Sequence, residues 1–379
     1  MFSYQLSRRF FAQLAEGLED LARRELEELG ATDIKSAYRG MYFNADERAL
    51  CEINYRARFI TRVLAPLINF DCHSARYLYK TLLKLPWDQV LDLDSSFAVT
   101  ANLSQSRLRH SQYASRVVKD AVVDHWRQRT GQRPRVDPRT PALWLHLHLH
   151  RNRATLSVDC SGGSLHRRGY RARSVEAPMM ETLAAAIVEL SGWEGDCPLV
   201  DLMCGSGTLT CEALMKFCRI PAGHLRKRFG LENLPDHDAA LFARVREEAD
   251  ARMRPLASGL LVGNDLSSEV LEVARANSRL LPFGESIEWR VGDFRELKKR
   301  ENQVLLCNPP YGRRLKGDAD PAQLLSALGD YLKRNCQGSR AFIYVGEREL
   351  LKSVGLHPSW KRPLKNGPLD GRLACYEMY

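Results

Sequence analysis

The sequence predicts an α/β protein whose second half forms a doubly wound, mainly parallel sheet, preceded by a smaller α+β region. Strand-like and helix-like segments alternate between residues 180 and 308, which is typical of a parallel sheet covered by helices. The stretch "DLMCGSGTLT" (201–210) places a glycine-rich turn between a strand and a helix. Residues 10–65 show the order helix, strand, strand, helix, which indicates a small α+β domain.

The first half is predicted to hold a mixture of helices and short strands. Residues 10–29 place leucines near helical spacing, and Gly30 closes this helix as a C-terminal cap. Residues 111–131 place an apolar stripe from Tyr113 to Trp126 on one face, which predicts an amphipathic helix. The remaining elements expected here are two strands around Arg39-Gly40, a helix over 47–65 that ends before Pro66, a strand over 96–104 and a hairpin over 143–159.

The second half is predicted to alternate strands and helices after a linker at "SGGS" (161–164). Because strands alternate with helices, the strands are expected to run parallel. A long irregular insertion over 219–236 interrupts the alternation. The expected helices are 180–191, 209–218, 238–253 and 267–281, and the expected strands are 198–203, 259–265, 287–293 and 302–308.

The composition excludes several classes of protein. With 44% hydrophobic and 27% charged residues, the chain has the balance of a soluble globular protein. No apolar stretch approaches the roughly 20 residues of a membrane-spanning helix. The start, "MFSYQLSRR", lacks the apolar core and cleavage site of a secretory signal. We therefore expect a cytoplasmic protein with no membrane partner, whose ten scattered cysteines are reduced and mostly buried.

Two patterns invite a metal-binding interpretation, and neither is favoured. His146, His148 and His150 share one face of a predicted strand, but no nearby cysteine or acidic pair completes a site. A half-buried strand face explains them more simply. The second pattern is a set of cysteines spaced seven residues apart, Cys197, Cys204, Cys211 and Cys218. That spacing matches no zinc motif and spans a strand, a loop and a helix, so we expect no bound metal.

Positive charge is concentrated in one segment. Residues 107–173 carry 14 Arg and one Lys against four Asp, a surplus of 11 positive charges, although the whole chain has a net charge of only +10. Arginine suits bidentate contacts with phosphate, so this concentration favours a nucleic-acid partner over a merely solvated surface. The candidate contacts in and around this segment are Arg107, Arg109, Arg116, Lys119, Arg167, Arg168 and Arg171.

The glycine-rich turn indicates a ligand site, because Gly205 and Gly207 let the backbone turn tightly and a ligand approach it closely. A dinucleotide site is disfavoured. The third glycine of that motif is replaced by Thr210, and the next acidic strand end, Asp265, lies far beyond the roughly 20 residues expected. A phosphate-binding Gly-Lys-Ser/Thr sequence is also lacking.

Acidic residues end three of the predicted strands, at Asp201, Asp265 and Asp293. Carboxylates at this edge suit a cationic, ribose-bearing ligand, because one can hold ribose hydroxyls and another an exocyclic amine. S-adenosylmethionine carries a sulfonium cation, an amino acid and adenosine, and it has no phosphate to repel these groups. The turn and the three carboxylates together predict this cofactor.

The next strand ends in "CNPPYG" (307–312), which indicates transfer to an exocyclic amine. The side-chain oxygen of Asn308 and the backbone carbonyl of Pro309 can both accept hydrogen bonds from an NH2 group, which aims its lone pair at a methyl group. Pro309 and Pro310 stiffen the loop before the substrate arrives. Tyr311 offers a ring on which a base can stack, worth roughly 1–3 kcal/mol. We therefore predict that Asn308 to Tyr311 are the catalytic residues.

These motifs resemble those of the THUMP-domain class I RNA methyltransferases, and are most similar to the bacterial 23S rRNA guanine-N2 methyltransferases of the RlmL type. In the first half the resemblance rests on "GLEDLARRELEELGA", "SQYASRVVKDAVVD" and "LSVDCSGGSLHRRGYR". In the second half it rests on "APMMETLAAAIVELSGW", "DLMCGSGTLTCEAL", "CNPPYG" and "KNGPLDG". The resemblance implies an N-terminal ferredoxin-like lobe (1–48), a THUMP RNA-binding domain (49–160) and a Rossmann-like methyltransferase domain (161–379).

The resemblance also implies residue roles. Glu181 and Thr182 would approach the methionine end of the cofactor, Asp265 would hold its ribose and Asp293 its adenine. The loop around the cofactor would comprise Asp201, Cys204, Gly205, Gly207 and Thr208. Two departures from the family pattern are visible: Leu202 replaces a proline and Met180 replaces a lysine. Neither removes a group that methyl transfer needs, but this chain cannot make any interaction that depends on that lysine.

The expected function is methylation of a guanosine N2 amine in 23S rRNA. Two alternatives stay open, namely the same reaction on tRNA, and a non-catalytic RNA-binding ribosome-assembly factor with a vestigial cofactor pocket. Nothing in the residues themselves separates rRNA from tRNA, and the choice rests on the resemblance.

Overall fold

The computed structural model describes residues 1–173, 179–310, 320–367 and 369–379. The chain divides into two compact units. The first unit comprises residues 1–14, 23–165 and 226–246, and the second comprises residues 15–22, 166–225 and 247–379. The segment 226–246 thus returns to the first unit and residues 15–22 belong to the second. The domain ranges 1–48, 49–160 and 161–379 stay a prediction.

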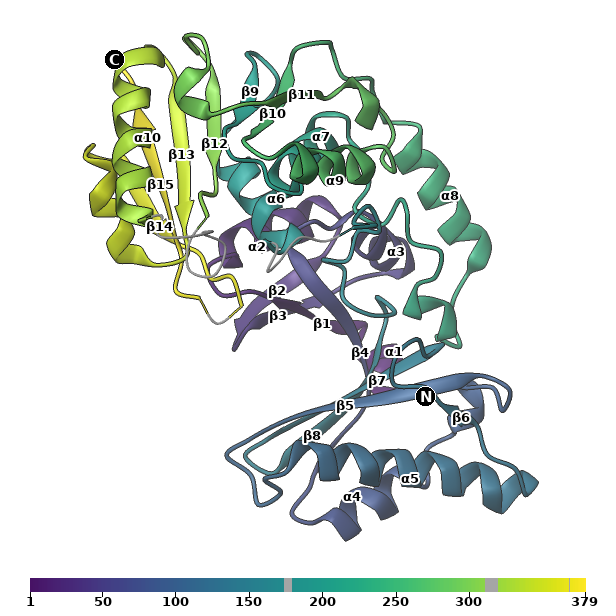
Figure 1. The fold of residues 1–379 in the computed structure, drawn as a ribbon. Coiled ribbons are helices and arrows are strands. Elements are labelled where there is room, and N and C mark those ends of the chain that lie inside the picture. Colours follow the sequence, from purple (N-terminus) through teal and green to yellow (C-terminus); the bar gives the residue numbers. More distant parts are fainter. Residues whose placement is uncertain (174–178, 311–319, 368) are drawn as a thin grey trace. The chain divides into compact units, whose positions relative to one another are not determined.

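The first unit is built on a sheet with eight strands in the described part of the chain, in the order β2-β3-β1-β4-β8-β7-β5-β6. The helices α4 and α5 pack together, and α5 packs against β5 (Figure 1). The strands are β1 (Arg9–Leu14), β2 (Thr32–Ala37), β3 (Gly40–Asn44), β4 (Ile60–Asp71), β5 (Ser96–Ser104), β6 (Arg135–Val136), β7 (Leu143–His150) and β8 (Arg153–Asp159). The helices are α1 (Ser3–Ser7), α2 (Glu19–Glu28), α3 (Glu47–Arg56), α4 (Ala75–Leu82), η1 (Trp87–Gln89) and α5 (Ser111–Thr130), and the returning segment adds η2 (Gly230–Asn233) and most of α8 (Ala239–Asp250).

Two helices predicted in the first unit are shorter than expected, because one end of each predicted range forms a strand instead. Residues 10–14 belong to β1, where Phe10, Ala12 and Leu14 are buried in alternation, and the helix begins only at Glu19. Leu14 therefore follows the period of a strand and not that of a helix. The helix expected over 47–65 ends at Arg56, and the later residues form β4. The opening order is thus β1-α2-β2-β3-α3-β4, a ferredoxin-like arrangement.

Pro66 lies inside β4 and does not end it. It pairs with Ser157 of β8, and the register shifts between Pro66 and Ile68. Proline has no backbone amide hydrogen to donate to the neighbouring strand. A bulge interrupts the regular hydrogen-bond pattern and therefore tolerates a proline. The prediction that an element ends before Pro66 was therefore wrong.

The later elements of the first unit match their predictions. Residues 96–104 form β5, and residues 111–130 form α5, which Gly131 closes in the left-handed conformation (φ +73°). The strands β7 and β8 form the expected antiparallel hairpin. Its turn residues, Arg151 and Asn152, both have positive φ, as tight hairpin turns require.

The second unit contains a sheet whose seven strands, within the described residues, lie in the order β11-β10-β9-β12-β13-β15-β14. The first five run parallel, and β15 is antiparallel to both of its neighbours. The strands are β9 (Leu199–Asp201), β10 (Leu261–Asp265), β11 (Glu288–Val291), β12 (Val304–Cys307), β13 (Arg340–Val345), β14 (Trp360–Pro363) and β15 (Arg372–Glu377). The helices are α6 (Glu181–Leu190), α7 (Thr208–Phe217), α9 (Ser268–Ser278) and α10 (Pro321–Asn335), with short turns η3 (Gly284–Ser286), η4 (Phe294–Glu296) and η6 (Arg348–Val354).

The predicted doubly wound architecture of the second unit is confirmed. Both faces of its central strands are buried: Val200, Leu305 and Ile343 pack in a core with Leu328 of α10, whereas Leu306 points to the opposite face and is equally buried. Continuous apolar strands of this kind are expected where helices cover both faces.

The thiol and membrane predictions can also be compared with the structure. All ten cysteines are free, and all are buried except Cys197, which is half-buried. The prediction that the cysteines are mostly buried is therefore confirmed. In the described part of the chain, no helix is both long and apolar enough to cross a bilayer.

Candidate cofactor and substrate site

The carboxyl ends of three parallel strands in the second unit meet at one edge. Asp201 ends β9 and pairs in register with Gly263 of β10 and Leu306 of β12. Asp265, the last residue of β10, and Asn308, which follows β12, therefore lie at the same edge as Asp201. Ligands in open α/β sheets bind outside this edge. The structure thus brings together the acidic strand ends and the start of the NPPY loop.

The glycine-rich turn between β9 and α7 has the backbone conformation that only glycine adopts freely. Gly205 and Gly207 have φ of +55° and +79°. A side chain on Gly207 would also lie 2.9 Å from Trp289 and 3.1 Å from Ala274, so this residue is required for close packing. A Cβ on Gly205 would meet no atom within 4 Å. The turn therefore leaves open space beside Gly205, which is where a ligand can approach the backbone.

The carboxylate of Asp265 joins this turn to the next helix. Its Oδ2 atom accepts a hydrogen bond from the Gly205 amide (2.9 Å), and its Oδ1 atom accepts one from the Ser267 amide (3.0 Å). One side chain thus fixes both the glycine turn and the start of α9. This contact was not foreseen, because it joins residues sixty positions apart in the sequence.

Asn264 is a site residue that the sequence reasoning missed. Its buried side-chain amide donates to the carbonyls of Leu202 (3.1 Å) and Gly292 (3.1 Å), which lie after β9 and β11. Its backbone carbonyl accepts from the Cys204 amide (2.9 Å). Asn264 therefore ties the loop after β9 to the loop after β11 at the edge of the sheet. A polar residue directly before the acidic strand end was the available signal.

Five buried side-chain oxygens around this edge have no hydrogen-bond partner among the described residues: Glu181 Oε2, Thr182 Oγ1, Asp201 Oδ1, Asn264 Oδ1 and Asn308 Oδ1. Buried polar atoms are rarely left in this state, so each is an acceptor that a bound group can use. Glu181 and Thr182 lie at the start of α6, and both are buried. Cys204 is buried as well, with its thiol 3.7 Å from the Gly205 carbonyl. The set fits a ligand that carries an ammonium or sulfonium cation.

Burial changes the acidity of two of these carboxyl groups. Desolvation raises the pKa of Asp201 to about 7, although a hydrogen bond from Thr210 (3.2 Å) works in the other direction. Burial also raises the pKa of Glu181, opposed mainly by the nearby Arg171. A cationic ligand would favour the charged form of both groups. Carboxyl groups with shifted pKa values are a common feature of binding sites.

Asp293 lies two residues beyond the end of β11, and the side chain of Arg295 contacts both of its carboxylate oxygens. These hydrogen bonds lower the pKa of Asp293. Its adenine-binding role therefore stays a prediction, and it requires an amine to reach a carboxylate already engaged by Arg295. Of the NPPY loop, Pro309 is buried and Pro310 is half-buried. Tyr311 lies outside the described residues.

Two of the predicted RNA contacts are instead internal to the second unit. Arg168 is buried, and its Nε atom lies 3.3 Å from the buried carboxylate of Glu212, which also accepts from Tyr170 (3.2 Å). The prediction that Arg168 contacts RNA was wrong, because this side chain does not reach the surface. Arg171 donates to the Met179 carbonyl (2.9 Å) and to Thr208 Oγ1 (3.0 Å).

Arg171 also lies 3.5 Å from Glu181, so it connects three parts of the cofactor edge: the start of α6, the start of α7 and the segment before α6. A guanidinium with several donors is suited to this bracing role. The structure therefore assigns Arg171 to the architecture of the cofactor site and gives no support for a direct phosphate contact.

The other basic candidates are accessible. Arg107, Arg109, Arg116 and Arg167 are exposed. Lys119 is half-buried and forms an ion pair with Asp120 (2.9 Å). A surface hollow of about 500 Å³ is lined by residues 103–109 and Asn152, and so includes two of these arginines. This hollow lies wholly within the first unit.

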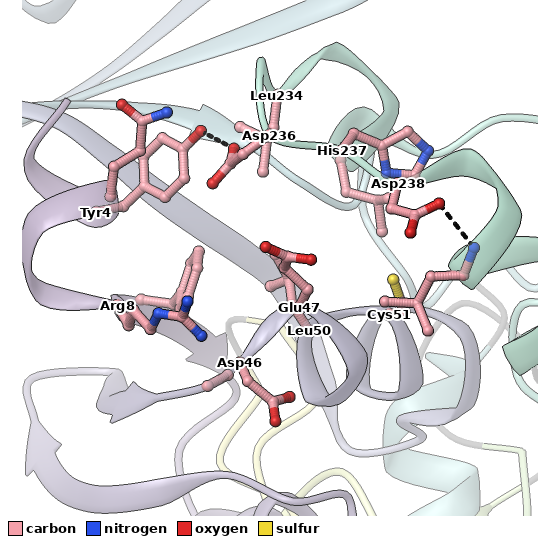
Figure 2. Close-up of a pocket in the computed structure, with 15 residues that line it drawn as sticks. Tyr4, Arg8, Asp46, Glu47, Leu50, Cys51, Leu234, Asp236, His237 and Asp238 are labelled. Atoms are coloured by element: carbon pink, nitrogen blue, oxygen red, sulfur yellow. Dashed lines mark hydrogen bonds between the residues drawn. The ribbon is translucent and has the colours of Figure 1, made fainter. Parts of the chain in front are cut away.

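The first unit contains a second pocket that could be considered as a ligand site, but the contacts of its residues argue against that role. It measures about 80 Å³ and is lined by residues of α1, α3 and the segment 231–241 (Figure 2). Figure 2 shows the Tyr4 hydroxyl donating to Asp236. Asp46 and Asp238 accept hydrogen bonds from backbone amides at the starts of α3 and α8. Burial raises the pKa of the Cys51 thiol to about 12, so this thiol stays protonated. These acidic groups are therefore already engaged in hydrogen bonds that stabilise the fold.

The histidine face of β7 likewise has local explanations. His146 is buried and contacts the Asn102 side chain (3.3 Å), and burial lowers its pKa to about 4. The rings of His148 and His150 stack on each other at 6.4 Å. Within the described residues, no three His, Cys, Asp or Glu side chains are grouped as metal ligands.

Comparison with protein families identifies three consecutive domains. A ferredoxin-like domain of the RlmL type matches residues 9–64, a THUMP domain matches residues 72–159, and an RMKL-like methyltransferase domain matches residues 168–374. The last match covers more than half of the chain. Its range includes the glycine-rich turn, the acidic strand ends and Asn308.

Individual relatives extend over almost the whole chain. A Synechocystis protein named "Putative RNA methyltransferase slr0064" is 35% identical over 374 residues, covering 98% of this chain and 97% of the relative. The crystal structure of SMU.472, solved as a complex with SAH, is 28% identical with a TM-score of 0.84, and covers 98% of each chain. A Listeria monocytogenes structure named "a predicted N6-adenine-specific DNA methylase" is also 28% identical with a TM-score of 0.84, covering 99% of this chain and 98% of the other. This chain therefore belongs to the RMKL-like methyltransferases that combine an RlmL-type ferredoxin-like domain, a THUMP domain and a methyltransferase domain.

Proposed function

We propose that this chain transfers a methyl group from S-adenosylmethionine to the exocyclic N2 amine of a guanosine in 23S rRNA. The observation that carries the proposal lies at the edge of the second sheet. There the buried carboxylate of Asp201 ends one strand, and the unpartnered Oδ1 atom of Asn308 follows the strand paired with it. The end of β9 thus suits a cationic methyl donor, and the end of β12 suits the amine that receives the methyl group.

The residues fit S-adenosylmethionine as the cofactor. When bound, it supplies a methyl group activated by the sulfonium charge. Glu181 and Thr182 present unpartnered acceptors suited to an ammonium group, and the space beside Gly205 admits a ligand to the backbone. The related structure of SMU.472 was solved with SAH, the product form of this cofactor, which supports the same choice here.

Asn308 and Pro309 provide the acceptors for the target amine. The exocyclic nitrogen of a base is a poor nucleophile, because its lone pair is delocalised into the ring. Two fixed acceptors that take both N–H hydrogens direct this lone pair and stabilise the charge that develops on nitrogen. Burial of Pro309 and the stiffness of its ring hold the acceptors in place before the substrate binds. No strong general base is needed, because the nitrogen becomes acidic once it is methylated.

An RNA substrate is supported by the THUMP domain, by the exposed arginines of the first unit and by the name of the Synechocystis relative. The preference for guanosine in 23S rRNA rests on the RlmL-type domain. An N6-adenine amine is the second candidate, because a structural neighbour is named for that activity and because two acceptors suit any exocyclic amine. The third candidate is the same guanosine reaction on tRNA.

The test compares Asn308→Ala with wild type in two assays. Calorimetry should show unchanged S-adenosylmethionine binding, whereas methyl transfer to RNA from a strain lacking this chain should fall by about 10²–10³-fold, as expected for loss of one preorganised polar group. Full activity of the variant would contradict the mechanism.

Mass spectrometry of nucleosides from the same strain identifies the product. Loss of N2-methylguanosine from the 23S rRNA fraction is the expected result. Its loss from tRNA, or loss of N6-methyladenosine, would select one of the two alternative substrates. RNA binding by the wild type without any methyl transfer would indicate a non-catalytic assembly factor.

A further inference from the structure

The open face of the ferredoxin-like sheet carries two neighbouring aromatic rings that the proposed reaction does not use. In the first unit, β1 and β3 are adjacent central strands, flanked by β4 and β2. Phe11 of β1 pairs directly with Tyr42 of β3, and Lys35 of β2 pairs with Tyr42 on its other side. Residues that are paired in register project from the same face of a sheet. Phe11, Tyr42 and Lys35 therefore form a row across three strands.

The other face of these strands is the core of the lobe. Phe10 and Phe43 alternate with the row, are almost fully buried, and have ring centroids 5.8 Å apart. By contrast, Tyr42 is 37% exposed, and Phe11 is half-buried. The sequence thus places aromatic residues on both sides of the same strands, although only one side needs them for folding.

The Phe11 and Tyr42 rings of this open face meet edge to face, with an angle of 61° between their planes. A Cβ atom on Gly40 would lie only 2.2 Å from the Phe11 ring, so a glycine at this position lets the ring lie across the neighbouring strand. The Phe11 and Tyr42 rings contact each other with centroids 4.9 Å apart. The guanidinium carbon of Arg9 lies 5.0 Å from the centre of the Tyr42 ring. Aromatic rings and guanidinium planes are the groups on which unpaired bases stack.

The charges on this face favour RNA over an apolar or basic partner. Arg9 and Lys35 flank the rings, and Lys35 keeps 60% of its side chain exposed while pairing with Asp33. Asp33 is the one acidic residue in β1, β2 and β3. The turn between β2 and β3 adds Arg39 and the 87% exposed Tyr38. Cations around exposed rings are complementary to phosphates around bases.

We propose that the Phe11–Tyr42 face of the ferredoxin-like lobe stacks roughly two or three unpaired bases of the RNA substrate, as aromatic residues on central strands do in other single-stranded RNA readers. This surface is separate from the basic helices and hollows of the THUMP region. It would hold a single-stranded segment next to the methylated structure and discriminate against a fully paired duplex, because paired bases do not expose a face for stacking. The inference rests on the proposal that the substrate is RNA.

The experiment measures binding of fluorescein-labelled decauridylate to the full chain by anisotropy. Tyr42→Leu and Phe11→Leu keep an apolar side chain but remove the ring, and each is expected to weaken binding roughly 5- to 150-fold, the equivalent of 1–3 kcal/mol. Tyr42→Phe keeps the ring and should bind as wild type does. The matched control is Tyr379→Leu, which removes a 94% exposed tyrosine of the second unit and should have no effect. Circular dichroism melts confirm that each variant is folded.

Two further readouts separate stacking from a general loss of structure. The salt dependence of binding should keep its slope in Tyr42→Leu, because the slope reports phosphate contacts and not stacking. Photocrosslinking with 5-iodouridine RNA should label the peptide that contains Phe11 or Tyr42. Unchanged affinity in both leucine variants, or crosslinks confined to other peptides, would overturn the proposal.

The result is independent of the catalytic test. If Tyr42→Leu binds decauridylate normally while the wild type methylates RNA, this inference fails and the proposed function stands. If the leucine variants lose binding but the wild type transfers no methyl group, the stacking inference stands and the proposed function fails. If Tyr42→Leu instead dissociates a dimer in light scattering without changing RNA affinity, the face is an interface between two copies and the RNA proposal is wrong.

Discussion

At the scale of single residues, burial decides what the charged groups of this chain do. Arg168 and Arg107 belong to the same basic segment, yet Arg168 forms an internal ion pair with Glu212 and Arg107 is exposed. The carboxyl groups divide in a similar way. Asp201 is fully buried with an elevated pKa, whereas Asp293 is paired with Arg295 and has a lowered pKa. Residue type alone does not distinguish these roles.

The buried Asp201 carboxyl predicts a pH-dependent stability. Its pKa is raised to about 7 in the folded protein from an ordinary value of 3.8. The folded state therefore holds a proton that the unfolded state has released, and the free energy of unfolding should fall as pH rises from about 4 to 7. Burial of Glu181 acts in the same direction. Asp201→Asn removes the titration, so its urea-unfolding free energy should vary less over this range than that of wild type.

The exposed Asp94→Asn is the control for this experiment and should keep the wild-type profile. Asp201→Asn should also weaken S-adenosylmethionine binding, because the amide cannot supply the negative charge that a cationic ligand favours. A wild-type free energy of unfolding that stays constant between pH 4 and 7 would contradict the assignment.

At the scale of elements, the glycine-rich turn joins β9 to α7 and serves two separate purposes. Gly207 is needed for packing against Trp289 and Ala274, whereas Gly205 borders open space. Both residues have positive φ. Both glycines therefore allow the left-handed backbone of the turn, but only Gly207 is needed for packing and only Gly205 leaves room for a ligand.

The two glycines should respond differently to substitution by alanine. Gly205→Ala should cost only about 1–2 kcal/mol of stability, the penalty of a left-handed backbone, while it obstructs a ligand and lowers S-adenosylmethionine affinity at least tenfold. Gly207→Ala should be more destabilising, because its Cβ would also lie 2.9 Å from Trp289. Urea unfolding and calorimetry measure the two effects. Equal stability losses, or full cofactor affinity in Gly205→Ala, would be inconsistent with this division.

At the scale of the whole molecule, the excess of positive charge lies in the segment 107–173, and its candidate arginines Arg107, Arg109 and Arg116 are exposed on the first unit. The acidic strand ends and Asn308 lie in the second unit. We therefore propose that substrate docking depends mainly on the first unit and methyl transfer on the second. Variants in one unit should affect RNA affinity, and variants in the other should affect cofactor binding and transfer.

RNA binding should depend strongly on salt, because each phosphate that the protein neutralises releases counterions. The double variant Arg107→Gln/Arg109→Gln should lower RNA affinity. It should also reduce the slope of log K against log salt by about 0.7 for each single-strand phosphate that the variant no longer neutralises. Cofactor affinity should not change. The control Lys352→Gln, an exposed lysine of the second unit, should leave both quantities unchanged. An RNA affinity that is insensitive to salt would exclude phosphate contacts as the basis of binding.

Features that depend on local patterning could be predicted from the amino-acid sequence. Strand-helix alternation predicted the parallel sheet, and the two glycines of the turn predicted the ligand site, where the structure shows positive φ. The acidic ends of β9 and β10 followed from their position after apolar runs. The amphipathic helix α5 and the hairpin β7–β8 also follow from nearest-neighbour periodicity. These features could be predicted because the residues that define them are close together in the chain.

Features that depend on partners far apart in the chain became visible only in the folded protein. Residues 10–14 have apolar positions compatible with a helix, and pairing with β3 and β4 makes them a strand. Arg168 is internal because Glu212, 44 positions away, supplies a buried carboxylate. Asp265 fixes a turn 60 positions earlier, and Phe11 meets Tyr42 across two strands. Burial and pairing depend on which surfaces the folded chain brings together, and no local pattern contains that information.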